Sequence, residues 1–340
     1  RCQDFMAGLA TGRASVFGRV KKLTLTTRVV EGFDSMPYFA MLNTLLTELK
    51  NPATLVWEHF LDSRNPREVI ETVAQAFTLL SNLREIDMIL GQHYRNPGLD
   101  FPIKALTHLH TLSIAWDMYH YSCRPPADVL QSLGSVLAGS AELKHFAFKC
   151  PSGFEDSGTL VALGEIFGDE TRFSESLELS SLQVSGVIIT GDEFQKYLPY
   201  LRYLEKLEIE HDPSPSSQDH MGEICRLLAA AGVFLKRVTF DAFKDPAVLH
   251  YLASFHRMTE WSLPLEKRYI QAIAQCQRLE YVCCWVAIRP EDVQANNASA
   301  LRSWLEVCLH LPRLRQLKCL PVPAKEFDTT MDVAQAGFRI

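Results

Sequence analysis

The chain has 340 residues, of which 47% are apolar and 22% are charged, and its formal net charge is −6. This balance is that of a globular protein and excludes a disordered chain. The small negative charge disfavours nucleic acid and anionic membranes as partners. The longest apolar run, residues 227–235, is interrupted by Gly232 and is far shorter than a membrane-spanning helix.

The nine cysteines are an odd number, and no two of them form a CxxC pair. This usage predicts free thiols and a reducing intracellular compartment, the cytoplasm or the nucleus. The first twenty residues lack the charged and apolar regions of a secretion signal. Because the chain starts at Arg1 rather than at methionine, we expect a fragment or a processed chain with a segment missing upstream.

A six-residue pattern recurs along the chain, with apolar residues at its first, fourth and sixth positions. It is clearest at residues 204–209, LEKLEI. Other clear matches begin at Val20, Leu83, Leu109, Leu143, Leu179, Leu235 and Leu314, and weaker ones at Pro52, Met258 and Leu279. The mean spacing of about 29 residues lies at the long end of the roughly 20 to 29 typical of leucine-rich repeats. Each match predicts a short strand.

Segments with helical periodicity separate these strands. The helix expected from residue 65 has a capping Asn65, Pro66 at its first position and Glu68 three residues after the cap. Thr190 and Glu193 form a second capping box, which opens a helix leading to Tyr203. The other helices are expected at residues 37–50, 129–137, 159–167, 224–231, 248–255, 269–276 and 301–309.

This alternation predicts an α/β leucine-rich-repeat solenoid, a horseshoe of about eleven irregular strand–helix repeats, with a parallel concave sheet and convex helices. A doubly wound α/β sheet would also alternate strands and helices. Its strands should be continuous apolar runs, whereas these carry charges at alternate positions, and no phosphate-binding glycine turn follows Leu25. We expect a cap or linker at residues 1–19, the solenoid at 20–322 and a tail or cap at 323–340.

Three of the repeats, VKKLTL at 20–25, LREIDM at 83–88 and LRQLKC at 314–319, give the chain a resemblance to the leucine-rich-repeat region of fungal F-box-like proteins, in the ribonuclease-inhibitor-like class. The resemblance implies a substrate receptor of a cullin-RING ubiquitin ligase, with an F-box upstream of Arg1 that contacts the ligase adaptor. The regular Asn or Cys at offset 8 is missing, as at Arg28, Gly91 and Asp212. Without an F-box, a binding scaffold remains.

Strand alternation should send offsets 2, 4 and 6 of the pattern into the concavity, where a protein partner would bind. On the later strands these positions hold an acidic lane beside two aromatic residues, which is suited to a basic segment with an apolar anchor. The candidate partner-binding residues are Glu208, Glu210, Asp241, Glu260, Tyr281 and Trp285. An alternative reading makes the acids a solvated face and places Trp285 in the core after a one-residue register slip.

No residue cluster predicts catalysis, a metal site or a cofactor. His108 and His110 flank Leu109, and His120 and Cys123 have a ligand-like spacing, but neither pair has a second pair of ligands. The vicinal Cys283 and Cys284 should point to opposite faces of their strand. The expected function is a non-catalytic protein-interaction scaffold. The alternatives are a sensor or ligand-binding repeat domain of a larger receptor and, less favoured, an enzyme with a concave pocket near Tyr281 and Cys283.

Overall fold

A computed structural model describes residues 20–28, 49, 52–60, 77–78, 80, 82–90, 108–116, 124–125, 127–150, 161–168, 177–210, 217–240, 251, 259–264, 270–288 and 296–323. The chain divides into two compact units, residues 1–188 and 189–340. Each unit is described by itself.

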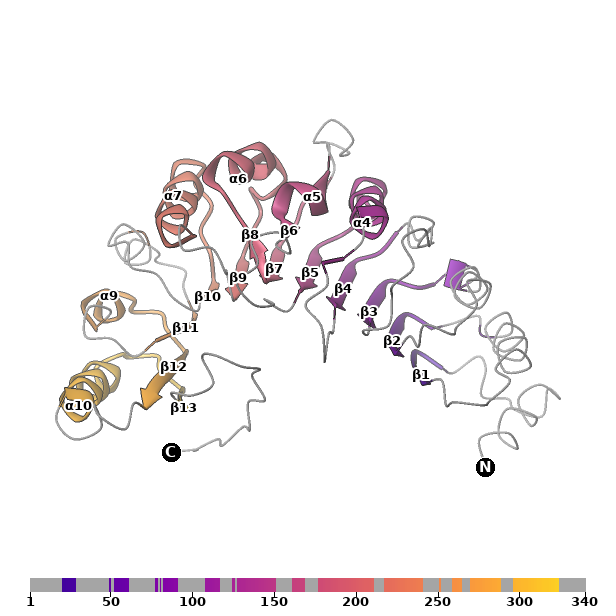
Figure 1. Cartoon of the computed structure of the whole chain (residues 1–340). Coiled ribbons are helices and arrows are strands. Elements are labelled where there is room, and N and C mark those ends of the chain that lie inside the picture. Colours follow the sequence, from indigo (N-terminus) through magenta and orange to yellow (C-terminus); the bar gives the residue numbers. More distant parts are fainter. Residues whose placement is uncertain are drawn as a thin grey trace, which may run out of the picture. The chain divides into compact units, whose positions relative to one another are not determined.

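Unit 1 contains a parallel sheet in which the strands follow one another in chain order. The strands are β1 (Lys22–Arg28), β2 (Thr54–Phe60), β3 (Glu85–Leu90), β4 (Thr111–Trp116), β5 (His145–Lys149) and β7 (Ser181–Ser185). Helices α4 (Ala127–Gly139) and α5 (Leu163–Phe167) lie on one side of this sheet (Figure 1). A second, two-stranded parallel ladder pairs β6 (Val161–Ala162) with β8 (Val187–Ile188).

Unit 2 repeats the same arrangement. Its parallel strands are β9 (Lys206–Glu210), β10 (Arg237–Phe240), β11 (Glu260–Pro264), β12 (Tyr281–Ile288) and β13 (Gln316–Pro323). Its helices are α6 (Gly191–Tyr197), the 3₁₀ turn η3 (Leu198–Tyr200), α7 (Ser217–Ala230), α9 (Ile270–Gln275) and α10 (Asn296–Leu309). The helices again lie on one side of the strands, so the described helices leave the opposite strand face open (Figure 1). We call it the helix-free face.

All eleven predicted strands are present, and the α/β leucine-rich-repeat solenoid is confirmed as the fold class. Each strand begins two residues after the first apolar position of its pattern, and paired strands join residues of equal offset, as Leu112 does with Ile86 and Phe146. The fourth and sixth positions of the pattern are buried and the residues between them are more exposed, as in β4 and β5. Apolar residues at these spacings therefore determine both the strands and their register.

The helix predictions are confirmed where the structure describes them, with one correction. Thr190 caps α6, and its hydroxyl oxygen accepts a hydrogen bond from the Glu193 N–H at 3.2 Å. The helix predicted at 159–167 is wrong at residues 161 and 162, which form strand β6, so that α5 begins only at Leu163. The segments predicted as helices at 37–50, 65–80 and 248–255 lie largely outside the described residues.

The core lies between the strands and the helices. In β2, Trp57 packs edge-on against Phe77, with 5.1 Å between the ring centroids. In β5, Phe146 packs in the same way against Phe167 of α5, at 5.9 Å. All four side chains are almost fully buried. Burial of aromatic side chains of this size contributes strongly to stability, so these contacts hold the helices onto the strands.

Neighbouring repeats are joined by the main chain at the residue that follows the first apolar position, which we call the joint residue. The carbonyl oxygen of Lys21 accepts hydrogen bonds from the N–H groups of Ala53 and Thr54 at 2.8 and 3.1 Å. The same pair of bonds is accepted by the joint residues Ala53, Arg84, His110, Lys144, Glu205, Lys236, Thr259 and Glu280. These bonds satisfy buried backbone groups without an asparagine ladder.

A tight turn leads into many of the strands. Its closing bond runs from the first apolar N–H to the carbonyl three residues earlier, as from Leu143 to Ser140 at 3.0 Å. The residue just before the first apolar position is therefore exposed at the corner, and we call it the corner residue. Equivalent turns present the corner residues Asn82, Glu142, Tyr203, Arg278 and Arg313. At the corner before β4, His108 has a positive φ of 68°.

Candidate functional site

The helix-free face of unit 2 carries its polar side chains in rows, because paired strands keep equal offsets. The first row holds Lys206, Arg237, Glu260, Tyr281 and Gln316, the first residues of β9 to β13. The second row, two residues further along, holds Glu208, Thr239, Ser262, Cys283 and Lys318. Side chains in one row lie about one strand spacing apart, roughly 4.8 Å, and can contact one another.

An ion-pair network connects the two rows. The Arg237 Nε lies 3.3 Å from Glu208 Oε1 and 3.1 Å from Glu260 Oε2. The Lys206 Nζ lies 3.1 Å from the same Glu208 oxygen. The Glu208 side chain is only 7% exposed, so its carboxylate is held away from water by two cations. The two acids and the two bases of this network cancel in charge.

The structure brings together three of the six predicted partner-binding residues. Glu208 and Glu260 share Arg237, and Tyr281 is in register with Glu260 on the neighbouring strand. Glu210 ends β9 and is half-buried. Asp241 lies outside the described residues, and of Trp285 only the backbone position is described.

The strand register around Trp285 shows no slip. Trp285 pairs with Pro264 and Leu320, which occupy the same offset in their own repeats. The backbone of β12 therefore keeps the register that the pattern predicts at this position. Among the outward positions of the second row, however, Glu208, Thr239 and Cys283 are buried, although alternation predicts them to be solvated.

Sequence reasoning assigned the acids of this region to the candidate site and left out the two bases. Lys206 and Arg237 occupy outward positions of the same rows, and Arg237 stands beside Glu260 in the register. Opposite charges at equal offsets of adjacent strands are the signal that predicts such pairs. Applied to the first row, this signal would have indicated a charge-balanced network in place of an acidic lane.

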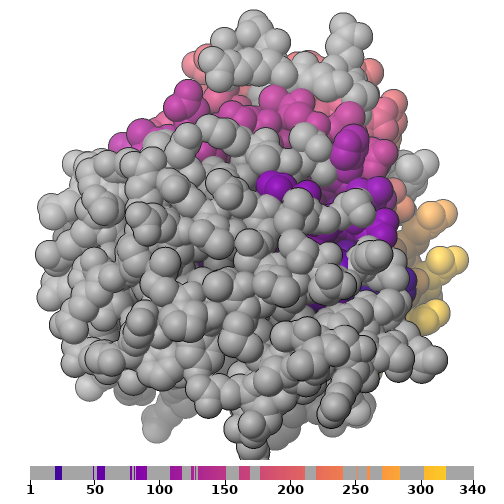
Figure 2. Space-filling model, turned by 90° about the vertical axis from the view of Figure 1, so that its right-hand side faces the viewer, coloured from indigo at the N-terminus to yellow at the C-terminus, as the bar shows by residue number. Residues whose placement is uncertain are grey.

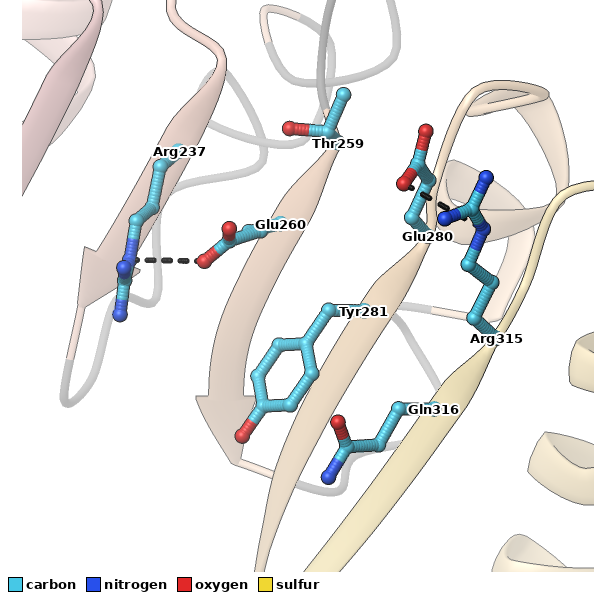
Figure 3. Close-up of a pocket in the computed structure, with 7 residues that line it drawn as sticks. All are labelled: Arg237, Thr259, Glu260, Glu280, Tyr281, Arg315 and Gln316. Atoms are coloured by element: carbon cyan, nitrogen blue, oxygen red, sulfur yellow. Dashed lines mark ion pairs between the residues drawn. The ribbon is translucent and has the colours of Figure 1, made fainter.

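A shallow pocket opens where strands β10 to β13 begin (Figure 3). Its volume is about 460 Å³, and it is lined by Arg237, Thr259, Glu260, Glu280, Tyr281, Arg315 and Gln316. On one side Arg237 pairs with Glu260, and on the other the Arg315 Nε lies 3.7 Å from Glu280 Oε2. Tyr281 and Gln316 project from neighbouring strands between these two pairs (Figure 3). The pocket therefore offers both donors and acceptors.

Tyr281 has an unusual environment in this pocket. The pKa of its phenol is raised to about 12, chiefly by burial and next by the neighbouring Cys283, through its charge and a hydrogen bond. Glu260 acts in the same direction, while Arg237 opposes the shift. The phenol therefore stays protonated at neutral pH and can donate a hydrogen bond to a ligand.

The helix-free face of unit 1 is lined by small hydroxyls that are hydrogen-bonded to acids on neighbouring strands. Thr54 Oγ1 donates to Glu85 Oε2, and Ser113 Oγ donates to Asp87 Oδ1, both at 2.8 Å. The described residues of this unit, in indigo to magenta, form part of the surface seen in Figure 2. Glu85 and Asp87 are thus already occupied by hydroxyl donors, and the pocket of unit 2 remains the stronger candidate.

Within the described residues, no group of three or more His, Cys, Asp or Glu is placed to hold a metal ion. His108 and His110 are exposed on either side of the buried Leu109, and His110 Nε2 lies 3.1 Å from Glu142. His120 and Cys123 fall outside the described ranges. Five cysteines, Cys150, Cys225, Cys276, Cys283 and Cys308, are free buried thiols. Among the helices that the structure describes, none is both long and apolar enough to cross a membrane.

No protein-family model and no curated protein sequence matches the chain. Solved structures of similar fold include the leucine-rich-repeat-containing protein LegL7 of Legionella pneumophila, which is 11% identical. That match covers 88% of this chain and 91% of LegL7, with a TM-score of 0.41. A Bacteroides fragilis protein is 10% identical over 92% of this chain and 68% of its own, with a TM-score of 0.33. At these identities the comparisons concern the fold alone.

Proposed function

We propose that the chain is a non-catalytic protein-interaction scaffold that binds a protein partner on its helix-free face. The observation that carries the proposal is the position of the ion-pair network and the pocket on strands β9 to β13. Both are built from side chains at or near the first positions of these strands, and the described helices lie on the other side of the strands (Figure 1). Leucine-rich-repeat solenoids offer extended strand surfaces of this kind for binding.

The partner proposed for this face carries a basic segment with an aromatic or apolar anchor. Glu260, whose side chain is 38% exposed, is the accessible acid of the network. Tyr281 and Trp285 on β12 are the residues proposed to receive the anchor. Aromatic residues in a desolvated centre supply most of the binding energy of many interfaces.

The pocket chemistry supports binding over catalysis. A general acid or base works best when its pKa lies near the working pH. In Tyr281 the pKa is raised to about 12, which makes the phenol a weaker acid. The neighbouring carboxylate of Glu260 is engaged by Arg237.

In its specific form, we propose that the chain is the substrate-recognition arm of a fungal F-box-type ubiquitin-ligase receptor in the cytoplasm or nucleus. Residues 20–25, 83–88 and 314–319 resemble repeats of fungal F-box-like proteins, which supports this form of the proposal. The buried cysteines without disulfides support the reducing compartment. Tagged full-length protein should then co-purify with a ligase adaptor and a cullin. Recovery of other binding proteins without either of these would leave only the general scaffold.

Two substitutions test the proposed binding face. We expect Trp285→Ala and Glu260→Lys each to weaken the complex with the co-purified partner by about tenfold or more, which corresponds to about 1.4 kcal/mol. Glu306→Lys, at an exposed position of α10, is the matched charge control and should leave binding unchanged. Isothermal calorimetry with the purified partner measures the affinity of the wild type and of each variant. Unchanged affinity in both test variants would refute the proposed face.

A further inference from the structure

The corner and joint residues of adjacent repeats face one another, and in unit 1 they form ion pairs. His110, a joint residue, lies 3.1 Å from Glu142, the corner residue of the next repeat. Lys144 lies 3.2 Å from Glu178 in the same relation. Each pair sets an acid against a basic group. These two pairs balance a basic group with an acid at the edge of unit 1 where β4 to β7 begin.

The same edge of β12 and β13 lacks this balance. Here the corner residues are Arg278 and Arg313, and the joint residues are Glu280 and Arg315. The equivalence of the repeats places Arg313 opposite Glu280, as Glu142 stands opposite His110. By the same equivalence Arg278 stands opposite Thr259, which carries no charge. The three arginines therefore exceed the one carboxylate of Glu280 by two positive charges. We call Arg278, Arg313 and Arg315 the arginine corner.

The arginine corner is accessible. The Arg315 side chain is 80% exposed, and its Nε lies 3.7 Å from Glu280, which is too far for a hydrogen bond. Arg278 and Arg313 are exposed as well, and neither makes an ion pair within the described part of the chain. Their guanidinium groups are therefore free to bind a carboxylate in two-pronged fashion.

A second observation points to a ligand at this edge. The pocket of about 460 Å³ adjoins the arginine corner, because Arg315 and Glu280 belong to its lining. Beyond them it offers the phenol of Tyr281 and the side-chain amide of Gln316 (Figure 3), whereas the Thr259 hydroxyl donates to the Lys236 carbonyl at 3.2 Å. Its two acids are each paired, Glu260 with Arg237 and Glu280 with Arg315. A carboxylate entering the pocket would therefore find several donors and would compete with Glu280 for Arg315.

We propose that the arginine corner and the adjoining pocket dock a short acidic segment of a partner protein, with one carboxylate in the pocket and others on Arg278 and Arg313. Adjacent strands are about 4.8 Å apart, and residues along an extended peptide rise about 3.3 Å each, so a few residues span the corner. Nucleic acid fits less well, because the chain as a whole has a net charge of −6. The inference rests on the proposed interaction role and adds a positively charged surface that shares the pocket, lined in part by Arg237 and Glu260, with the ion-pair network.

The test uses the full chain and a dye-labelled peptide of eight residues that alternates Asp or Glu with Gly or Ser. Anisotropy is measured at about 20 mM salt, where exposed charges are weakly screened. The wild type should bind this peptide. It should not bind the same peptide with Asn and Gln in place of Asp and Glu. We expect Arg278→Glu with Arg313→Glu to weaken binding by about tenfold or more, and salt above about 0.5 M to abolish it.

The matched control is Lys196→Glu with Arg302→Glu, which changes the net charge equally at exposed positions of α6 and α10. It should alter binding less than about twofold. Circular dichroism checks that both double variants are folded. No binding by the wild type, or equal losses in both double variants, would overturn the proposal. Displacement of the peptide by an equimolar single-stranded RNA would assign the surface to nucleic acid instead. This experiment changes neither Trp285 nor Glu260, so its failure would leave the test of the scaffold role by Trp285→Ala and Glu260→Lys undecided and still to be made.

Discussion

A single residue, Glu208, shows how a side chain at an outward strand position becomes buried. Alternation along β9 predicts that its carboxylate points into water. The side chains of Lys206 and Arg237 instead lie against the carboxylate, at 3.1 and 3.3 Å, and only 7% of the Glu208 side chain remains exposed. A charge at this depth is stable only when it is paired. Glu208 therefore positions Arg237, which in turn holds Glu260 at the pocket.

Ser140 is a buried polar residue without a partner. Its side chain is fully buried, and its hydroxyl makes no hydrogen bond within the described residues. The equivalent turn positions hold Leu80, Leu201, Cys276 and Leu311. None of these side chains has a hydroxyl group that needs a hydrogen-bond partner when it is buried. We expect Ser140→Ala to raise the free energy of unfolding by about 1 kcal/mol, because an unsatisfied hydroxyl no longer has to be buried. Urea unfolding followed by circular dichroism measures the change.

Ser135 on the preceding helix, α4, gives the control. Its hydroxyl is exposed and donates to the Gln131 carbonyl at 3.0 Å. Ser135→Ala should change the free energy of unfolding by no more than about 0.5 kcal/mol. If Ser140→Ala were instead destabilising, its hydroxyl would have to possess a partner.

At the scale of elements, the strands could be predicted and the side-chain network could not. Apolar residues at the first, fourth and sixth positions mark all eleven strands that the pattern predicts, because their burial against the helices dictates the pleat. The two-residue strands β6 and β8 are too short to carry any periodicity, so β6 was assigned to a helix. The pairing of Arg237 with two acids depends on side-chain torsions and on the register of three strands. A single strand does not contain that information.

The packing of α4 against α5 depends on a glycine. A Cβ at Gly134 would lie 3.1 Å from the carbonyl oxygen of Phe167 and 3.3 Å from that of Ile166. We expect Gly134→Val to lower the free energy of unfolding by about 1 to 3 kcal/mol, because the backbone of α5 has to move. Thermal or urea unfolding measures this loss.

Gln131→Val places the same side chain at an exposed position of α4. Only the poorer helix propensity of valine then applies, a cost below about 0.7 kcal/mol. Valine has a better helix propensity than glycine, so propensity alone predicts no loss at Gly134. Unchanged or increased stability of Gly134→Val would therefore mean that α5 accommodates the added side chain and that the packing does not depend on this glycine.

For the whole molecule, the buried thiols predict loss of stability in alkali. Burial raises the pKa of Cys150 and Cys276 from 9.0 to about 12. Above pH 9 the unfolded chain releases these protons while the folded chain keeps them. The free energy of unfolding should therefore be constant with respect to these groups below pH 9 and fall between about pH 9 and 12.

Urea midpoints between pH 7 and 10.5 measure this dependence. The double variant Cys150→Ala with Cys276→Ala has lower stability throughout, because it loses buried sulfur atoms, but its stability should fall less steeply above pH 9. An unchanged slope in the double variant would mean that other groups carry the alkaline transition.

The main-chain joint between repeats has a consequence for how such a chain can evolve. The joint uses one carbonyl and two N–H groups, so it is indifferent to the side chains that carry them, as Ala53, His110 and Glu280 illustrate. Proline at either of the two donor positions would break the joint, because proline has no N–H. Insertions and deletions between joints leave these bonds intact. Repeats of very unequal length can therefore be stacked side by side, and sequence drift can erase family signatures while the architecture persists.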